Sequence, residues 1–447
     1  MRRIISIAIL TFRDSVRAKL VAALAAVVAV AVIGLPMLLK ADGTTTGVAR
    51  MTLLYPLGAA FAFLAVAAPW IAAASLASDI KGRTLQLLRV KPVRMWQLWC
   101  GKWLGLLFLN AALLAGAFLC VYIRLAATGA LAAEDIAIAK RHIQPVLPPL
   151  ERQIAEMESN IAASSKRGMT SKERRELRAT LRRRLPYANA SLRSGDTWHW
   201  FFTPEHLPME GETVWFCLGL HSDALSQKQP KAKILFRVEG GDNGSALAGE
   251  LTDFSSRKVE FSLPAPATTG TNRLELVIAN TGEKNAPQLL VQPRKGLFLF
   301  LRAGRLEANM LRAYAVLLSL LALLLAIGLT AGAFFTLPVA VFTTTCAIIA
   351  IIASAYAVSD PDILDPDSLA TLPVIQRLQF HLSVVVTKTL ATASAPALSP
   401  APLAHLSMSE WVPEKELFHS IAGNAIILPA ILAFLSSLHL ARKELPE

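Results

Sequence analysis

Five stretches of this chain contain no Asp, Glu, Lys or Arg, and they limit what the chain can fold into. They are residues 20–39, 51–78, 103–123, 313–359 and 417–441. A helix of roughly 20 apolar residues crosses a hydrocarbon core of about 30 Å, so four of the runs fit one crossing each. The run at 313–359 fits two, with a turn predicted at 330–338, where Gly332 and Pro338 favour a break. The sequence therefore predicts an α-helical polytopic membrane protein with six transmembrane helices.

The composition agrees with this class. Hydrophobic residues make up 54% of the chain and its mean hydropathy is +0.46, which is more apolar than soluble proteins usually are. The first run is too long for the apolar core of a signal peptide and follows a charged segment, so we expect no cleaved leader. Cys100, Cys120 and Cys346 lie in or beside predicted spans, which leaves Cys217 alone between them and predicts no disulfide framework.

Basic residues predict which side of the membrane each connection faces. Residues 79–102 carry six Lys and Arg against one Asp, and residues 1–19 are also rich in Arg. Short connections of this kind stay in the cytoplasm, so both segments and the C-terminal tail are predicted inside. Residues 124–312 and 360–416 then lie outside. Long translocated domains largely escape the charge rule, so the ten basic and five acidic residues of 151–184 do not contradict this topology.

The predicted outer region between spans three and four has two parts. Residues 124–195 favour an antiparallel helical hairpin, because apolar residues recur at helical spacing and the TSKE segment from Thr170 to Glu173 is typical of a capping box. Residues 196–305 change to a period of two, which predicts an antiparallel β-sandwich. Its strand-like segments are TWHWFF, TVWFCLGLH, AKILFRVE, RKVEFSL, RLELVIAN, QLLVQ and GLFLFL.

Motifs of enzymatic chemistry are missing from the sequence. There is no G-x4-G-K-[ST] loop for ATP phosphates, no H-E-x-x-H, no C-x-x-C and no G-x-S-x-G. We therefore expect no catalytic residues, no metal ligands and no cofactor bound by this chain. Much of the net charge of +13 lies in 79–102 and 151–184, so no nucleic acid partner is expected.

Three groups carry weaker signals. His199 and His206 could share a metal, but no cysteine or carboxylate pattern joins them. The four carboxylates from Asp360 to Asp367 could hold Ca²⁺, although Asp-Pro pairs commonly start turns and the spacing of a calcium loop is absent. The aromatic residues of the first two strand-like segments could stack on sugar rings, whereas their alternation favours a core. They are Trp198, Trp200, Trp215 and Phe216.

The predicted spans contain no ionisable residue apart from His419 and His439 near the ends of the last one. Proton relays and ion-coupled pumps usually keep such residues in the membrane. This disfavours an ion-coupled transporter and a membrane-embedded enzyme. The energy for any transport is then expected to come from another chain.

Four segments resemble a known family. The segment from Ile5 to Leu20, ISIAILTFRDSVRAKL, resembles the N-terminal segment of ABC-2-type transport permeases, in which an amphipathic helix lies along the cytoplasmic membrane face. LEANMLRA at 306–313 and FTLPVAVF at 335–342 are similar to segments of a subgroup that has a large periplasmic insertion. The residues that match the N-terminal pattern are Thr11, Phe12, Arg13, Asp14 and Arg17.

The basic connection carries the second resemblance. In these permeases an acidic residue precedes Gly-Thr-Leu and further leucines, then a basic-Pro-hydrophobic-Arg step, then Gly-Lys at the next span. This chain departs from the pattern by Arg83, which is inserted between Gly82 and Thr84, and by Asp79 where Glu is commoner. The matching residues are Asp79, Gly82, Thr84, Leu85, Leu87, Leu88, Lys91, Pro92, Val93, Arg94, Gly101, Lys102 and Gly105.

The residues of 80–94 also favour a short coupling helix by themselves. Leu85 and Leu88 can share an apolar face with basic residues opposite, and Pro92 ends the helix because it restricts the residue before it. A rigid helix tied to two spans would move both when it is pushed. The alternative is a basic anchor that only fixes the orientation of the chain.

The resemblance implies a function. The chain would be the permease subunit of an ATP-driven ABC-2-type exporter in the bacterial inner membrane, paired as a homodimer or with a sister permease. A separate P-loop ATPase subunit would bind the ATP. The implied site residues are Gly82, Thr84, Leu85, Leu88, Lys91, Pro92 and Arg94 for ATPase coupling, Phe12, Arg13, Asp14 and Arg17 on the N-terminal helix, and Gly101, Lys102, Asn309 and Arg312 where spans three and four begin.

The predicted layout has five parts. A cytoplasmic amphipathic helix occupies 1–19, spans one to three lie within 20–123, the outer hairpin and sandwich occupy 124–195 and 196–305, and spans four to six lie within 306–447. The alternative function is a non-transporting scaffold anchored by its spans, whose outer domain binds an envelope polymer or protein.

Overall fold

The computed structural model places most of the chain in two compact units. Unit 1 comprises Met1–Ala139 and Gly304–Glu447, and unit 2 comprises Lys140–Ala303. The structure describes residues 2–38, 45–82, 94–132, 134–147, 149–164, 170–185, 190–192, 195–204, 208–209, 212–222, 234–239, 246–251, 258–265, 274–280, 289–291, 296–359 and 401–442.

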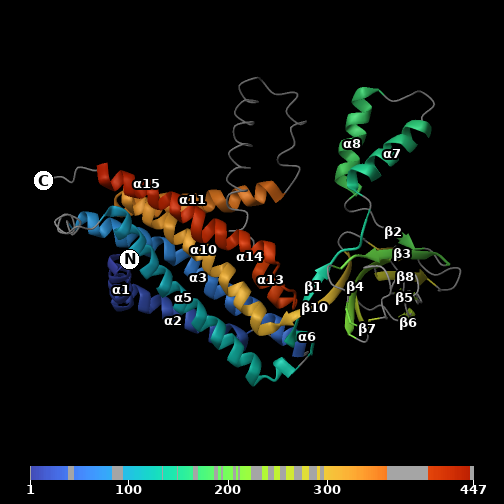
Figure 1. Cartoon of the computed structure of the whole chain (residues 1–447), viewed down its shortest axis with the longest axis horizontal. Helices are drawn as coiled ribbons and strands as arrows, with labels where there is room; N and C mark the ends of the chain where they lie inside the picture. The colour runs from blue at the N-terminus through green and yellow to red at the C-terminus, as the bar shows by residue number, and fades with distance from the viewer. Residues whose placement is uncertain are drawn as a thin grey trace. The chain divides into compact units, whose positions relative to one another are not determined.

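Unit 1 is helical (Figure 1). Its helices are α1 (Arg2–Arg17), α2 (Lys19–Leu38), α3 (Thr45–Lys81), α5 (Met95–Ala127), the short η1 (Ala130–Ala132) and α6 (Glu134–Ala137), α10 (Leu306–Phe334), α11 (Leu337–Ser359), α13 (Ala401–Ser407), α14 (Glu414–Ser420), the π-helical segment Ile421–Ile427 and α15 (Leu428–Arg442).

Five helices of unit 1 are long and apolar enough to cross a membrane. They are α2, α3, α5, α10 and the continuous helix Glu414–Arg442. These helices match five of the six predicted spans, so the chain is a polytopic helical membrane protein. The remaining predicted span, the fifth in chain order, corresponds to α11, whose described residues include a shorter apolar helix, Leu337–Ala350. Six spans therefore stay a prediction.

The helix α10 lies at the centre of unit 1 and packs against α3, α5, α11 and α15 (Figure 1). A Cβ atom at Gly328 would lie 2.1 Å from the carbonyl oxygen of Pro69, and one at Gly332 would lie 2.5 Å from that of Ala73. The backbones of α3 and α10 thus approach each other closely, as small residues permit between membrane helices. The predicted break within 330–338 is confirmed, because α10 ends at Phe334 and α11 begins at Leu337. The part of the prediction that gave Gly332 to the turn is wrong, since Gly332 lies inside α10.

Side-chain hydrogen bonds show that α5 runs antiparallel to α10. The indole Nε1 of Trp103 donates to the carbonyl oxygen of Ala322 at 2.8 Å, and the hydroxyl of Tyr314 donates to that of Ala111 at 3.0 Å. From the first pair to the second, the residue number rises along α5, from 103 to 111, and falls along α10, from 322 to 314. The contacts of Gly328 and Gly332 give the opposite result for α3, which runs parallel to α10.

The C-terminal helix also runs parallel to α10. The hydroxyls of Ser319 and Ser420 hydrogen-bond to each other, and the Ser436 hydroxyl donates to Thr330 Oγ1 at 3.1 Å. Both residue numbers rise together along the two helices. The chain between Phe334 and Glu414 must therefore return along the length of α10 before the C-terminal helix begins.

Unit 2 contains two antiparallel sheets (Figure 1). The larger has the order β1-β10-β4-β9-β2, with β7 also paired to β4, and the smaller has the order β3-β8-β5-β6. The strands are β1 (Ile138–Ile143), β2 (Ala190–Leu192), β3 (Thr197–Phe202), β4 (Thr213–Ser222), β5 (Ile234–Glu239), β6 (Ala246–Leu251), β7 (Lys258–Pro264), β8 (Leu274–Asn280), β9 (Leu289–Val291) and β10 (Leu297–Arg305). All seven predicted strand segments are strands.

One apolar core joins the two sheets. It combines Phe202 of β3 and Ile278 of β8 in the smaller sheet with Phe216 of β4 and Leu299 of β10 in the larger. Residues alternate between this core and the outer faces, as Leu274–Asn280 does along β8. The two sheets therefore pack face to face as a sandwich.

Two helices of unit 2, α7 (Leu150–Ser164) and α8 (Ser171–Arg184), pair as an antiparallel hairpin. Glu158 Oε2 lies 2.7 Å from Arg178 Nη2 in one ion pair, and Glu151 Oε1 lies 3.0 Å from Arg182 Nη2 in another. The first residue number falls as the second rises, which gives the antiparallel direction. Glu158 is buried, so its pairing with Arg178 also satisfies a carboxylate removed from water.

The predicted capping box at the start of α8 is confirmed. The backbone N–H of Thr170 donates to Glu173 Oε2 at 2.7 Å, and the backbone N–H of Glu173 donates to Thr170 Oγ1 at 3.4 Å. These hydrogen bonds satisfy donors that the first helical turn leaves without partners. Donation to the Glu173 carboxylate from the backbone N–H of Thr170, and also from its hydroxyl, lowers the pKa of Glu173.

The close contact of α3 and α10 gives a prediction about stability. Gly328→Ala is expected to lower the free energy of unfolding by about 1–3 kcal/mol, because its new Cβ forces the two helices apart. Gly116→Ala is the matched control, since a Cβ at Gly116 of α5 meets nothing within 4 Å. Thermal unfolding of the detergent-solubilised protein measures both. Equal midpoints for the two variants would contradict the packing role of Gly328.

Candidate functional site

Some of the described residues that resemble the permease family lie where α5 packs against α1 and against the end of α3. Gly101 and Gly105 of α5 lie one helical turn apart and seat α1. A Cβ at Gly101 would lie 2.7 Å from side-chain atoms of Ile7, and one at Gly105 would lie 2.5 Å from the carbonyl oxygen of Ala8. The N-terminal helix is thus held directly against α5, in addition to any contact with the membrane surface.

An ion pair between a buried lysine and a partly exposed aspartate joins α5 to the end of α3. The ammonium of Lys102 lies 2.6 Å from Asp79 Oδ2 and donates to the carbonyl oxygen of Ser75 at 2.8 Å and to its hydroxyl at 3.0 Å. The Lys102 side chain is 9% exposed and that of Asp79 is 27% exposed. A charge so placed needs partners, and Lys102 has three acceptors. Sequence reasoning named both residues by resemblance and did not predict that they touch.

The two ends of the predicted coupling segment lie at this junction. Gly82 follows α3, and its backbone N–H donates to the carbonyl oxygen of Ser78 at 2.8 Å. Arg94 precedes α5, and its backbone N–H donates to Gln97 Oε1 at 3.2 Å. The other predicted coupling residues lie outside the described residues. They are Thr84, Leu85, Leu88, Lys91 and Pro92.

The predicted residues of α1 divide between its faces. Phe12 is half-buried and, with Arg13, lines a groove between α1 and α5, whereas Asp14 and Arg17 are exposed. The buried residue of this pattern is Thr11, whose side chain would meet a Cβ at Gly105 at 2.9 Å. Thr11 also donates its hydroxyl to its own helix, at the Ile7 carbonyl oxygen. Thr11 therefore packs in the contact between α1 and α5.

Asn309, predicted at the start of span four, fastens the chain before the C-terminal helix. It is fully buried, its Nδ2 donates to the carbonyl oxygen of Glu410 at 2.6 Å, and its Oδ1 accepts from the backbone N–H of Val412 at 2.9 Å. The nitrogen and the oxygen of the Asn309 side-chain amide are thus both hydrogen-bonded. Asn309 therefore positions residues 410–412 against the start of α10.

Arg312 reinforces the same contact one turn later. Its guanidinium lies over the ring of Trp411 at 4.3 Å and approaches Glu414 Oε1 at 3.6 Å. The indole also packs against Gly304, where a Cβ would lie 2.6 Å from the ring. Trp411 thus contacts both a glycine and a cation.

His405 of α13 lies beside the same segment. Its Nδ1 is 2.8 Å from Glu410 Oε2 and its Nε2 is 3.6 Å from Glu416 Oε2. Hydrogen bonds to these two carboxylates raise the pKa of His405 to about 9 from an ordinary 6.5. The imidazolium therefore joins α13 to α14 at neutral pH.

The weaker sequence signals resolve in different ways. Trp200 and Phe216 are buried in the sandwich core, as their alternation favoured, and Trp198 stacks on Trp200 with ring centroids 5.4 Å apart. His199 is exposed and contacts Glu275 at 2.7 Å. Across the described residues, no group of three or more His, Cys, Asp or Glu could hold a metal ion. His206 and the carboxylates of 360–367 lie outside the described residues.

Comparison of the chain with family models, curated proteins and solved structures finds no match.

A double-mutant cycle tests the ion pair at the junction. Lys102→Met and Asp79→Asn are each expected to cost about 1–3 kcal/mol of unfolding free energy, less than a fully buried pair because Asp79 is partly exposed. The double variant is expected to cost less than the sum, with a coupling energy above about 0.5 kcal/mol. Thermal unfolding in detergent measures all three. Additive costs would show that the two charges act independently.

The raised pKa of His405 predicts a pH-dependent stability. Because the folded-state pKa is higher than the unfolded one, the contribution is complete below about pH 6.5 and is lost as pH rises through about 9. The loss is expected to reach up to about 3 kcal/mol. The midpoint of thermal unfolding should fall over this window in the native protein and stay flatter in His405→Gln. Parallel pH profiles for the two proteins would contradict the role of His405.

Proposed function

We propose that the chain is the permease subunit of an ATP-driven ABC-2-type exporter in the bacterial inner membrane. It pairs as a homodimer or with a sister permease, and a separate P-loop ATPase subunit binds and hydrolyses the ATP. The segment 80–94 lies on the cytoplasmic side and receives the ATPase. Unit 2 is an extracytoplasmic insertion between the third and fourth spans.

The junction of α1, α3 and α5 is the observation that carries this proposal. The segment 83–93 connects α3 to α5, and the Lys102–Asp79 ion pair joins the last turn of α3 to a point about two turns inside α5. Gly101 and Gly105 add α1 to the same group. A force applied to the connecting segment would therefore displace three helices together. A coupling element needs this property, and a purely basic anchor does not.

Helix directions support six spans. Because α10 and the C-terminal helix run parallel, the chain must recross the membrane between Phe334 and Glu414. The 23 residues of α11 reach about 34 Å at 1.5 Å per residue, which is long enough for that crossing. With α11 as the fifth span, both chain ends lie on one side. Residues 124–312 then lie on the opposite side, as the charge pattern predicts.

Site-specific photo-crosslinking in native membranes tests the coupling role. A photoreactive residue at Leu85 or Leu88 is expected to form an adduct with a P-loop ATPase, identified by mass spectrometry through its G-x4-G-K-[ST] sequence. The control position is Leu119, which is 59% exposed on α5 within a candidate span. No ATPase adduct is expected there.

The same experiment distinguishes the alternative. A scaffold anchored by its spans would give no ATPase adduct at either position, although it inserted normally. Adducts at Leu85 and Leu119 in equal yield would indicate non-specific capture and would also contradict the proposal.

A further inference from the structure

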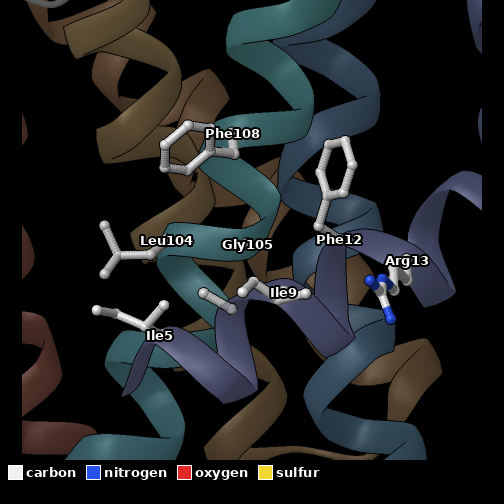
Figure 2. A pocket seen from close by; sticks show the side chains of 8 residues that line it. Ile5, Ile9, Phe12, Arg13, Leu104, Gly105 and Phe108 are labelled. Atoms are coloured by element: carbon white, nitrogen blue, oxygen red, sulfur yellow. The ribbon is translucent and has the colours of Figure 1, made fainter. Parts of the chain in front are cut away.

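An apolar groove runs between α1 and α5 beside the junction. Its volume is about 480 Å³, within the roughly 300–1,000 Å³ of ligand pockets. Ile5, Ile9 and Phe12 line it from α1, and Leu104 and Phe108 line it from α5. Figure 2 shows the rings of Phe12 and Phe108 on either side, with Gly105 between them. The groove is preformed, because Gly101 and Gly105 fix α1 on α5.

The groove leaves large apolar side chains uncovered. Phe108 is 68% exposed, Ile5 is 55% exposed and Ile9 is 49% exposed. Because α5 is long and apolar enough to cross a membrane, Phe108 lies on a helix whose free faces meet lipid chains. The occupant of such a groove is expected to be an apolar chain rather than water.

One end of the groove is cationic. Arg13, which lines it near the C-terminal end of α1, is exposed, and Arg17 and Lys19 follow it along the chain. Figure 2 shows Arg13 beside Phe12 at the edge of the apolar lining. An apolar groove with an exposed arginine at its edge complements a molecule with a hydrocarbon chain and an anionic head. Basic pockets between membrane helices bind acidic lipid headgroups in this way.

We propose that the groove binds an anionic membrane phospholipid. One acyl chain lies against Ile9, Leu104 and Phe108, and the phosphate of the headgroup accepts hydrogen bonds from Arg13. The guanidinium suits this contact because it presents paired donors to phosphate oxygens. The bound lipid covers the exposed apolar face of α1 and holds this helix at the membrane surface. This site does not depend on whether the chain couples to an ATPase.

Native mass spectrometry of the full-length protein in detergent tests the proposal. The protein is titrated with phosphatidylglycerol and with phosphatidylcholine of the same acyl chains. Phosphatidylglycerol is expected to bind more tightly. Arg13→Gln is expected to weaken its binding about fivefold, as one basic side chain near an anionic lipid contributes. Arg13→Lys keeps the charge and is expected to lose less. The control Arg17→Gln removes a charge from α1 outside the groove lining and is expected to change little.

A second pair of variants tests the apolar part. Ile9→Trp fills the groove and is expected to weaken binding of both lipids, whereas Leu10→Trp, at a 60% exposed position of α1 outside the groove lining, leaves binding unchanged. Equal binding of the two lipids, or equal losses for Arg13→Gln and Arg17→Gln, would overturn the site. A loss of dimer in Ile9→Trp with unchanged lipid binding would also overturn it, because the groove would then hold a second copy of the chain.

Discussion

Close approach of helix backbones is the constraint on which unit 1 depends. Lipid chains are as apolar as leucine, so membrane helices gain little by burying apolar surface against each other and rely on tight packing instead. Gly328 and Gly332 bring α10 onto α3, and Gly101 and Gly105 bring α1 onto α5. Residues spaced by four lie on one helix face, so each pair forms a continuous seat. The glycines of α10 thus determine that α3 is its neighbour, and the glycines of α5 determine where α1 packs.

Much of the fold could be predicted because the membrane and the sheet impose simple periodicities. Uncharged runs predicted the long helices, since charges are costly in hydrocarbon, and alternation predicted seven strands. The misses have physical reasons. The strand β6 reads ALAGEL, whose small residues give no alternation, and β1 carries Lys140 and Arg141 among its apolar residues. Gly332 was assigned to a turn by a local rule, whereas its function is a contact with Ala73, far away in sequence.

The candidate site was predictable as a set of residues and not as an arrangement. The uncharged run that predicted span three begins at residue 103, so Lys102 was placed at its edge. In the structure Lys102 lies inside α5 and its partners are Asp79 and Ser75 of α3. Predicting these contacts from the sequence would require knowing that α3 and α5 are neighbours. Asn309 likewise bonds residues about 100 positions later in the chain. No local pattern specifies contacts of this separation.

The contact of α10 with the C-terminal helix differs in kind from its contact with α3. Glycine contacts bring α3 and α10 together backbone to backbone, whereas hydroxyl hydrogen bonds join α10 to the C-terminal helix. Ser319 and Thr330 each donate to a carbonyl oxygen of α10, and they also pair with Ser420 and Ser436. The C-terminal helix also contains the π-helical segment Ile421–Ile427, a geometry that is rare and often found at functional sites. Under the proposed function, α1, α3, α5 and α10 then move as one group, because glycine contacts and an ion pair join them.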